Sequence, residues 1–279
     1  MISDQEIRYS AKLNGVAPRI VEKDYHIGLF LREIGKSKEK QYFIFKGGTA
    51  LRKCFFKNYR FSEDIDFTVT KRALNNRRIL IDIFNTLCNK CNKDFGTTFR
   101  FFNITTEREV YGQESYKTVI HYNGFEGIGK INIDMTFYEK VEIRPYTRQI
   151  KHLYSDKSDF GRTYLRVYRL EEIIAEKLRA TAYIHYYPRN RDIYDIWYLS
   201  ESAKLKHKQI AKVFIEKCNF KRIDPLLIEK IDNVYLEKFK KSWQAQIGHQ
   251  INNLPDFSKI KREFLQFTRD IIRIIKGLK

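Results

Sequence analysis

The sequence is poor in the features that mark disordered, secreted and membrane-spanning chains. It has only 5 prolines and 13 glycines among 279 residues, a composition that argues against a disordered chain. Residues 1–20 lack an apolar central region, so no signal peptide is predicted. No apolar run approaches the roughly 20 residues that cross a bilayer. We therefore expect a cytoplasmic protein without a membrane segment.

Cysteine is also scarce, and the four cysteines that occur do not form a complete zinc site. Cys88 and Cys91 make a single Cys-x-x-Cys pair, with no close pair of cysteines or histidines to supply the other two ligands. The pair also lacks the sequence context of a thioredoxin-like redox motif. We expect reduced thiols on the surface of a helix, as is usual in a reducing compartment.

Acidic residues are few relative to basic ones. The chain has 53 Lys+Arg against 34 Asp+Glu, which gives a formal net charge of +19. A field of this sign attracts polyanions, and nucleic acid is the first candidate. A generally lysine-rich composition is the alternative explanation. The hydrophobic content of 43% is sufficient for a packed core, in one large domain or in two smaller ones.

The most informative pattern lies in residues 41–69, which are predicted to form a strand, a glycine-rich turn, a helix, a loop and a second strand. Asp64 and Asp66 lie on the second strand, where alternation turns both side chains to the same face. Two such carboxylates repel each other, and a divalent cation removes that cost. Oxygen ligands together with phosphates are the usual arrangement for Mg²⁺. The pattern therefore favours a Mg²⁺ site over a solvated strand edge.

Gly47 and Gly48 stand between the first strand and the helix. Glycine lets the backbone approach a phosphate closely, and the N–H groups at the start of a helix attract anions. Glycine pairs are also common in ordinary turns. A phosphate cradle next to a paired-carboxylate metal site indicates nucleotide chemistry.

These segments resemble the first motif of the AbiEii/AbiGii family of nucleotidyltransferase-like toxins, to which the MenT toxins are related, within the DNA polymerase beta-like nucleotidyltransferase superfamily. Two runs carry the resemblance: Gly47-Gly48-Thr49-Ala50-Leu51-Arg52 and Arg60-Phe61-Ser62-Glu63-Asp64-Ile65-Asp66-Phe67. The predicted fold class is α+β, with a nucleotidyltransferase-type mixed sheet, flanking helices and a C-terminal helical domain. We predict a nucleotidyltransferase core domain over residues 1–165. A helical domain over residues 166–279 would contribute Lys177 and Asp195 to the site.

The resemblance also implies roles for single residues. Asp64 and Asp66 would hold Mg²⁺ in the active site. Asp134, in the middle of a strand predicted over residues 130–137, would complete the metal site and help to deprotonate the attacking hydroxyl group. The alternative for Asp134 is an exposed polar strand face. The residues expected to contact the nucleotide are Gly47, Gly48, Thr49, Arg52, Lys177 and Asp192.

Two helices predicted within residues 170–199 carry the remaining candidates. Lys177 shares the apolar face of its helix, where lysine is unusual. It either reaches solvent over its own apolar stem or binds phosphate, and the resemblance implies the triphosphate. Asp192 and Asp195 lie one helical turn apart and match the family's Arg-Asp-x-Tyr-Asp run. Asp192 fits a helix N-cap, and Asp195 is the preferred catalytic aspartate.

The N-terminal segment is predicted to be helical. Ser3 and Glu6 form a capping box, and Pro18 suits the first turn of a second helix. That second helix contains a run that also resembles the family, Glu22-Lys23-Asp24-Tyr25. We expect this helix to pack beside the sheet with its charges solvated, and we assign it no catalytic role.

Periodicity predicts further elements after the core motif. A helix over residues 74–94 would bury Ile79, Ile83 and Leu87 on one face, with Leu80 and Phe84 beside them. Residues 99–104 and 116–122 are predicted strands. The glycine-rich residues 123–130 are predicted to form a loop.

The expected activity is Mg²⁺-dependent transfer of a nucleoside monophosphate from an NTP to an acceptor, with release of pyrophosphate. By family analogy the acceptor is the 3′ end of tRNA. The same analogy gives the toxin of a toxin–antitoxin or abortive-infection system as the biological role, with a cognate antitoxin as partner. Two alternatives stay open, a protein-nucleotidylating (AMPylase-like) enzyme of the same fold and a non-catalytic RNA-binding module.

Overall fold

The computed structural model describes residues 1–108, 114–183 and 189–278. They form two compact units, Met1–Glu139 with Pro145–Val167, and Lys140–Arg144 with Tyr168–Lys279. The short segment 140–144 joins the second unit because the Glu172 carboxylate accepts hydrogen bonds from the backbone N–H groups of Glu142 and Ile143. The boundary between the units thus follows Val167. The functional division after residue 165 stays a prediction.

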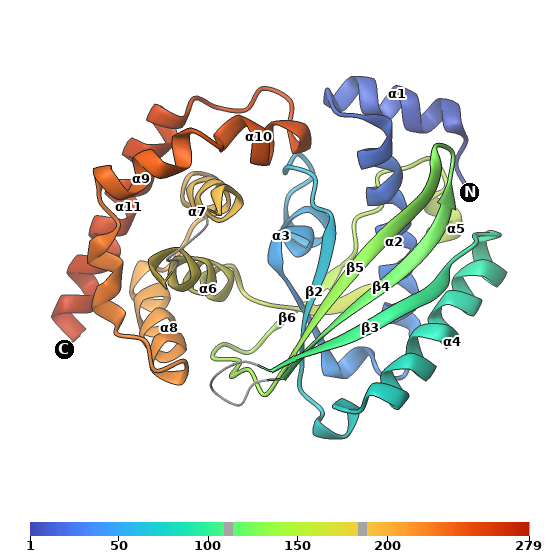
Figure 1. Ribbon diagram of the computed structural model, residues 1–279, viewed down its shortest axis with the longest axis horizontal. Helices are drawn as coiled ribbons and strands as arrows, with labels where there is room; N and C mark the ends of the chain where they lie inside the picture. The colour runs from blue at the N-terminus through green and yellow to red at the C-terminus, as the bar shows by residue number, and fades with distance from the viewer. Residues whose placement is uncertain (109–113, 184–188, 279) are drawn as a thin grey trace. The chain divides into compact units, whose positions relative to one another are not determined.

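The first unit is built on a seven-stranded mixed sheet in the order β3-β4-β5-β2-β1-β7-β6 (Figure 1). The strands are β1 Phe43–Lys46, β2 Asp64–Val69, β3 Arg100–Arg108, β4 Glu114–Gly124, β5 Gly127–Phe137, β6 Tyr146–Gln149 and β7 Tyr164–Val167. β2 pairs in parallel with β5, as β1 does with β7, and the other neighbouring pairs are antiparallel. The predicted α+β class with a mixed sheet is confirmed.

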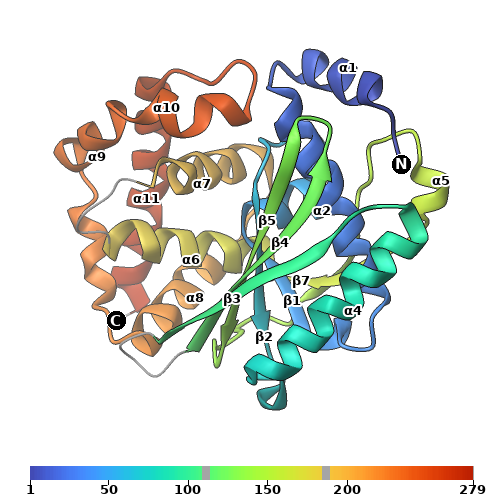
Figure 2. The same ribbon diagram turned by 45° about the vertical axis from the view of Figure 1, so that its right-hand side comes forward.

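Helices α2 and α4 pack together against one face of this sheet (Figure 1 and Figure 2). The helices of the unit are α1 Asp4–Asn14, α2 Pro18–Lys36, α3 Gly47–Ala50, α4 Arg77–Phe95 and α5 Lys157–Phe160, with shorter turns at Lys40–Tyr42 and Arg72–Leu74 and a π-helical turn at Leu51–Phe55. The predicted helix start at Ser3 is confirmed, because the Ser3 hydroxyl accepts a hydrogen bond from the Glu6 N–H at 3.2 Å, while the Glu6 carboxylate accepts one from the Ser155 N–H at 2.9 Å. Pro18 opens α2, where its missing N–H costs nothing.

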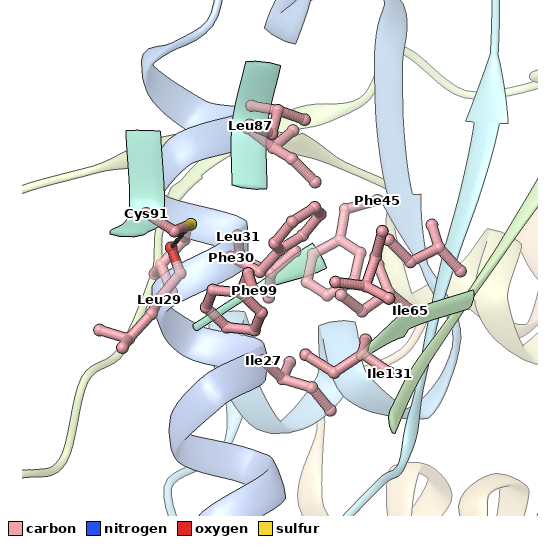
Figure 3. Packing of buried hydrophobic residues seen from close by; sticks show 14 of the residues in the cluster. Ile27, Leu29, Phe30, Leu31, Phe45, Ile65, Leu87, Cys91, Phe99 and Ile131 are labelled. Atoms are coloured by element: carbon pink, nitrogen blue, oxygen red, sulfur yellow. Dashed lines mark hydrogen bonds between the residues drawn. The ribbon is translucent and has the colours of Figure 1, made fainter. Parts of the chain in front are cut away.

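The hydrophobic core lies between these helices and the sheet (Figure 3). Figure 3 shows Phe30 and Leu31 of α2 beside Phe45, Ile65 and Ile131 of three neighbouring strands, and all five side chains are buried. Truncating a buried phenylalanine such as Phe30 costs about 3–5 kcal/mol. Because strand side chains alternate, the polar residues between Ile65 and Phe67, and those next to Ile131, point to the opposite face of the sheet.

The buried face of α4 differs from the predicted one. Ile79 is 39% exposed. The side chains that α4 buries in the core begin at the next residue and continue to the C-terminal end of the helix. The buried residues of α4 are Leu80, Phe84, Leu87, Cys88, Cys91 and Phe95. The prediction of surface thiols is also wrong, since all four cysteines are buried. The Cys91 Sγ lies 3.9 Å from the backbone oxygen of Leu29 (Figure 3), as suits a side chain that packs as a small hydrophobe.

The predicted loop over residues 123–130 is instead a tight hairpin. β4 extends to Gly124 and β5 begins at Gly127. Tyr122 pairs with Gly129 across the two strands, and a Cβ added at Gly129 would lie 2.1 Å from the Tyr122 ring. The glycine makes room for an aromatic neighbour on the next strand. A cluster of glycines here therefore indicates strand pairing and not a loop.

The second unit is helical around a buried ion-pair cluster. Its helices are α6 Leu170–Tyr183, α7 Asn190–Ser202, α8 His207–Phe220, α9 Asn233–Lys240, α10 Trp243–Ile247 and α11 Phe257–Leu278, with shorter turns at Pro225–Lys230 and Gly248–Gln250. The buried Lys217 Nζ lies 3.0 Å from carboxylate oxygens of both Glu172 and Glu176. The first of the two helices predicted within residues 170–199 was expected over Leu170 to Tyr186 and corresponds to α6; residues 184–186 lie outside the described ranges. Within those ranges, no helix is long and apolar enough to cross a membrane.

Candidate active site

Strands β2 and β5 bring three carboxylates to one face of the sheet. Their parallel register sets Asp64 opposite Asn132 and Asp66 opposite Asp134. The intervening Ile65 and Ile133 are fully buried on the other face, while the three aspartates are half-buried. The Asp134 strand thus lies directly beside the Asp-x-Asp strand, as a metal site shared by the three aspartates requires. The metal-binding and catalytic roles of the three aspartates stay predictions.

Polar neighbours hold this face in place. The Asn132 side-chain amide donates to Asp64 Oδ1 at 2.9 Å, and the Thr49 hydroxyl donates to the backbone oxygen of Asp64. Burial raises the pKa of Asp134, the charge of Lys117 opposes this shift, and the charge of Asp64 adds to it. A carboxylate with a raised pKa is better suited to accept a proton near neutral pH. The shift is thus consistent with the base role predicted for Asp134.

The glycine turn is shaped around side chains that follow it in the sequence. Gly47 has a φ of +76°, and a Cβ added there would lie 2.0 Å from Asp66 Oδ2. A Cβ at Gly48 would lie 2.8 Å from Arg60 Nη2 and 3.0 Å from the Ser62 hydroxyl oxygen. Gly47 is therefore favoured by its left-handed backbone and by Asp66, whereas a side chain at Gly48 would displace the end of Arg60 and crowd Ser62. The phosphate contact of this turn, Thr49 included, stays a prediction.

Arg52 lies in a buried network centred on Asp24. Arg52 Nε donates to Asp24 Oδ1 at 2.9 Å, and Lys53 Nζ and the Tyr154 hydroxyl each donate to Oδ2 at 2.7 Å. The Arg52 guanidinium also lies 3.6 Å from the centre of the Phe61 ring, within the range of a cation–π contact. These contacts give Arg52 a structural role. Its contact with the nucleotide stays a prediction.

The expectation of solvated charges on α2 is wrong for Glu22 and Asp24, which are 6% and 3% exposed. Burial alone would raise the pKa of Asp24, but the Lys53 and Arg52 cations and the hydrogen bonds from Lys53 and Tyr154 hold it well below its usual range. The sequence did contain a signal for this burial. The sequence of α2 carries apolar residues on every side of the helix, as is typical of a helix inside a core.

In the second unit, Lys177 of α6 lies between two aspartates of α7. Its Nζ is 2.6 Å from Asp192 Oδ1 and 2.8 Å from Asp195 Oδ2, and Asp195 is fully buried. Lys177 is therefore held by carboxylates and does not simply extend over its own stem to solvent. Asp192 is not the N-cap, because α7 begins at Asn190 and Arg189 precedes it. The nucleotide-binding and catalytic roles of the trio stay predictions.

The structure thus gathers the predicted residues into two groups, one in each unit. Asp64, Asp66 and Asp134 share the sheet of the first unit, and Lys177 joins its two aspartates in the second. That the two groups contribute to one active site stays a prediction.

The chemistry of the first group fits Mg²⁺. Among the described residues, no set of three or more His, Cys, Asp or Glu side chains could hold a metal ion unaided. Mg²⁺ does not require such a set, because it usually takes one or two carboxylates and completes its shell with water and substrate phosphates. Asp64 and Asp66 supply two half-buried carboxylates on one face, and Asp134 supplies a third on the neighbouring strand.

Comparison with known proteins identifies the family of the chain and supports its fold. The sequence model of the family "Nucleotidyl transferase AbiEii toxin, Type IV TA system" matches residues 29–267. No curated protein matches the chain in sequence. Among solved structures, the chain is similar to MenT4, a nucleotidyltransferase toxin from Mycobacterium tuberculosis H37Rv, with a TM-score of 0.70 and 17% identity over 98% of this chain and 90% of that chain. It is also similar to JHP933 from Helicobacter pylori, with a TM-score of 0.57 and 14% identity over 94% of this chain and 96% of that chain. At such low identity these two structures support the fold.

Proposed function

The chain belongs to the AbiEii family of nucleotidyltransferase toxins of type IV toxin–antitoxin systems, and we propose that it transfers a nucleoside monophosphate from an NTP to the 3′ end of tRNA in a Mg²⁺-dependent reaction. The observation that carries the proposal is the β2–β5 register, which sets Asp66 opposite Asp134 on the face that also holds Asp64. The net charge of +19 favours a polyanionic acceptor. The proposed role is that of a cytoplasmic toxin restrained by a cognate antitoxin.

In the proposed reaction the acceptor hydroxyl oxygen bonds to the α-phosphorus, the bond to the bridging oxygen breaks, and pyrophosphate leaves. Asp64 and Asp66 would hold the metal, which when bound offsets phosphate charge and aligns the attack. Asp134 takes the hydroxyl proton. Its raised pKa, caused first by burial, favours the protonated product of that step.

The other predicted residues keep supporting roles in the proposal. Gly47, Gly48 and Thr49 are proposed to face the outer phosphates. Lys177 is proposed to contact the triphosphate, and its ammonium is already fixed by the carboxylates of Asp192 and Asp195. Asp195 would orient the acceptor and Asp192 the nucleotide. Arg52, buried against Asp24, is proposed to support the glycine turn that it follows.

The test uses purified protein, Mg²⁺, bulk tRNA and each NTP labelled at its α-phosphate. The variants are Asp64→Asn with Asp66→Asn, and as a control the same type of substitution at Asp82, Asp82→Asn, which is exposed on α4. We expect label on tRNA with the wild type and the control, and a loss of at least about a hundredfold in the double variant.

Other outcomes would overturn the proposal in distinct ways. Label on protein alone would support the protein-nucleotidylating alternative. An absence of transfer from any NTP, with tRNA still bound, would support the binding module. Equal transfer by the double variant and the wild type would show that the reaction does not require Asp64 and Asp66.

A further inference from the structure

The face of the sheet that carries the carboxylates continues outward as an exposed surface on β3, β4 and β5. Along β4, Tyr116, Thr118 and Ile120 are buried, so Lys117, Val119 and His121 belong to the carboxylate face. In the backbone register of the two strands, Lys117 stands opposite Asp134. His121 pairs with Lys130 of β5 on one side and with Arg100 of β3 on the other.

A β-bulge turns an aromatic ring onto this surface. The register of β3 against β4 shifts between Phe101 and Asn103, and bulges commonly re-aim side chains in this way. Phe102, inside the bulge, is 62% exposed. Its ring is stacked on His121, with centroids 4.1 Å apart and an angle of 16° between the planes. The bases of single-stranded nucleic acids stack on flat, exposed aromatic rings of this kind.

Two cations flank the stacked pair. Within residues 1–108, 114–183 and 189–278, neither Arg100 nor Lys130 takes part in an ion pair. Burial lowers the pKa of His121, and the charges of Arg100 and Lys130 lower it further, which favours the neutral imidazole. Since no carboxylate pairs with Arg100 or Lys130 in the described ranges, both cations can complement a phosphate backbone.

The stacked pair lies within reach of the carboxylates. Lys130, the cross-strand partner of His121, shares strand β5 and its outward face with Asp134. Residues 130 and 134 of a strand are about 13 Å apart at roughly 3.3 Å per residue. A polymer end that rests on Phe102 and His121 can thus extend along β5 to Asp134.

We propose that Phe102, His121, Arg100 and Lys130 form a stacking platform for the unpaired 3′ end of the RNA acceptor. One base stacks on the Phe102–His121 pair, and the adjoining phosphates contact Arg100 and Lys130. The proposal rests on the proposed function and adds that the acceptor end must be single-stranded, because paired bases are stacked inside a duplex and cannot reach a protein ring. Charge complementarity favours RNA over a protein partner for this surface.

The first test measures binding without catalysis. Anisotropy of a labelled single-stranded RNA oligonucleotide is measured for wild type, Phe102→Ala and His121→Ala, without NTP. The control is Tyr9→Ala, which removes an equally exposed aromatic ring on α1. Removal of one stacking ring should raise Kd by about 5- to 150-fold, whereas Tyr9→Ala should leave it unchanged. A blunt RNA duplex should bind less tightly than the single strand.

The second test addresses the cations through the salt dependence of Kd. Arg100→Ala with Lys130→Ala should flatten the slope of log K against log salt by roughly 0.7 for each phosphate that the variant no longer neutralises. The control Lys38→Ala removes a lysine whose side chain is 92% exposed, and it should not change the slope.

Transfer to tRNA is measured on the same variants, so that the two proposals fail separately. We expect Phe102→Ala to raise KM for RNA and to keep KM for NTP. Transfer by wild type together with an unchanged KM for RNA in Phe102→Ala would refute the platform and leave the proposed reaction standing. Binding that depends on Phe102, without any transfer, would support the platform and refute the reaction. Unchanged RNA affinity with an altered oligomeric state in Phe102→Ala would refute the platform and assign the surface to a protein contact.

Discussion

Replacing Gly47 by alanine tests whether the glycine turn positions Asp66. Gly47 has a φ of +76°, and a Cβ there would lie 2.0 Å from Asp66 Oδ2. The left-handed backbone costs an L-residue about 1–2 kcal/mol. In addition, either the turn or the carboxylate must move. A displacement of about 1 Å at a reacting group can reduce the rate by roughly a hundredfold, so we expect transfer activity to fall by that order.

Gly96 provides the matched control for this substitution. It has a φ of +64° at the end of α4, and nothing lies within 4 Å of a Cβ added there. Gly96→Ala therefore carries the backbone cost of about 1–2 kcal/mol without any steric contact. Urea unfolding and label transfer to tRNA, measured on both variants, should show a similar loss of stability from the backbone. Only Gly47→Ala should lose activity and show an additional loss of stability.

An equal effect of the two substitutions on activity would refute the reasoning. A second check uses the Asp66→Ala background, in which the carboxylate that meets the new Cβ is gone. There, the difference between Gly47→Ala and Gly96→Ala in the free energy of unfolding should shrink, because the contacts with the carboxylate are gone and only the Cβ of residue 66, at 3.2 Å, still meets the new Cβ. An undiminished difference would mean that the clash does not involve the Asp66 carboxylate.

Three further predictions concern buried groups of the first unit and the thiols. Asp24→Asn leaves buried Lys53 and Arg52 without their carboxylate, so urea unfolding should show a loss of about 3–5 kcal/mol. Burial lowers the pKa of His26 to about 4, whereas its unfolded value is near 6.5. The unfolded chain therefore takes up a proton first, and the free energy of unfolding should fall as the pH drops from 6.5 to 4, by up to about 1.4 kcal/mol per pH unit. His26→Phe should flatten that fall. All four cysteines are buried, so an alkylating reagent followed by mass spectrometry should label them only after unfolding.

Short-range patterns were sufficient to predict much of the local structure. The alternation of polar and apolar residues around Asp64 fixes which face of β2 is buried, since a shift of the strand by one residue would expose Ile65 and Phe67. Likewise Ser3 caps α1 and Pro18 opens α2, because both act on backbone groups within one turn. The place of Asp134 beside Asp66 could not be read from either pattern. It followed from the family resemblance, because strand order is a property of the whole sheet.

The features that the sequence did not reveal depend on partners that are distant in the chain. Asp24 is buried because Arg52, Lys53 and Tyr154 converge on it, and no spacing rule joins those positions. The helical face of Lys177 was predicted, but its two aspartates belong to the next helix. A charged residue in an apolar segment thus indicates that a partner exists, and only the fold identifies the partner.

The β4–β5 hairpin shows how such distant contacts bear on the candidate site. Strand side chains have a period of two, so a slip of one residue in β5 would bury Asp134 and expose Ile133. The observed register is held where Gly129 admits the Tyr122 ring. It is also held at the turn, where the Glu22 carboxylate of α2 accepts a hydrogen bond from the Phe125 N–H at 2.7 Å. The same register presents Lys130 beside His121. The hairpin contacts therefore determine which residues of β4 lie beside Asp134 and Lys130, namely Lys117 and His121, whereas the β2–β5 register sets Asp134 opposite Asp66.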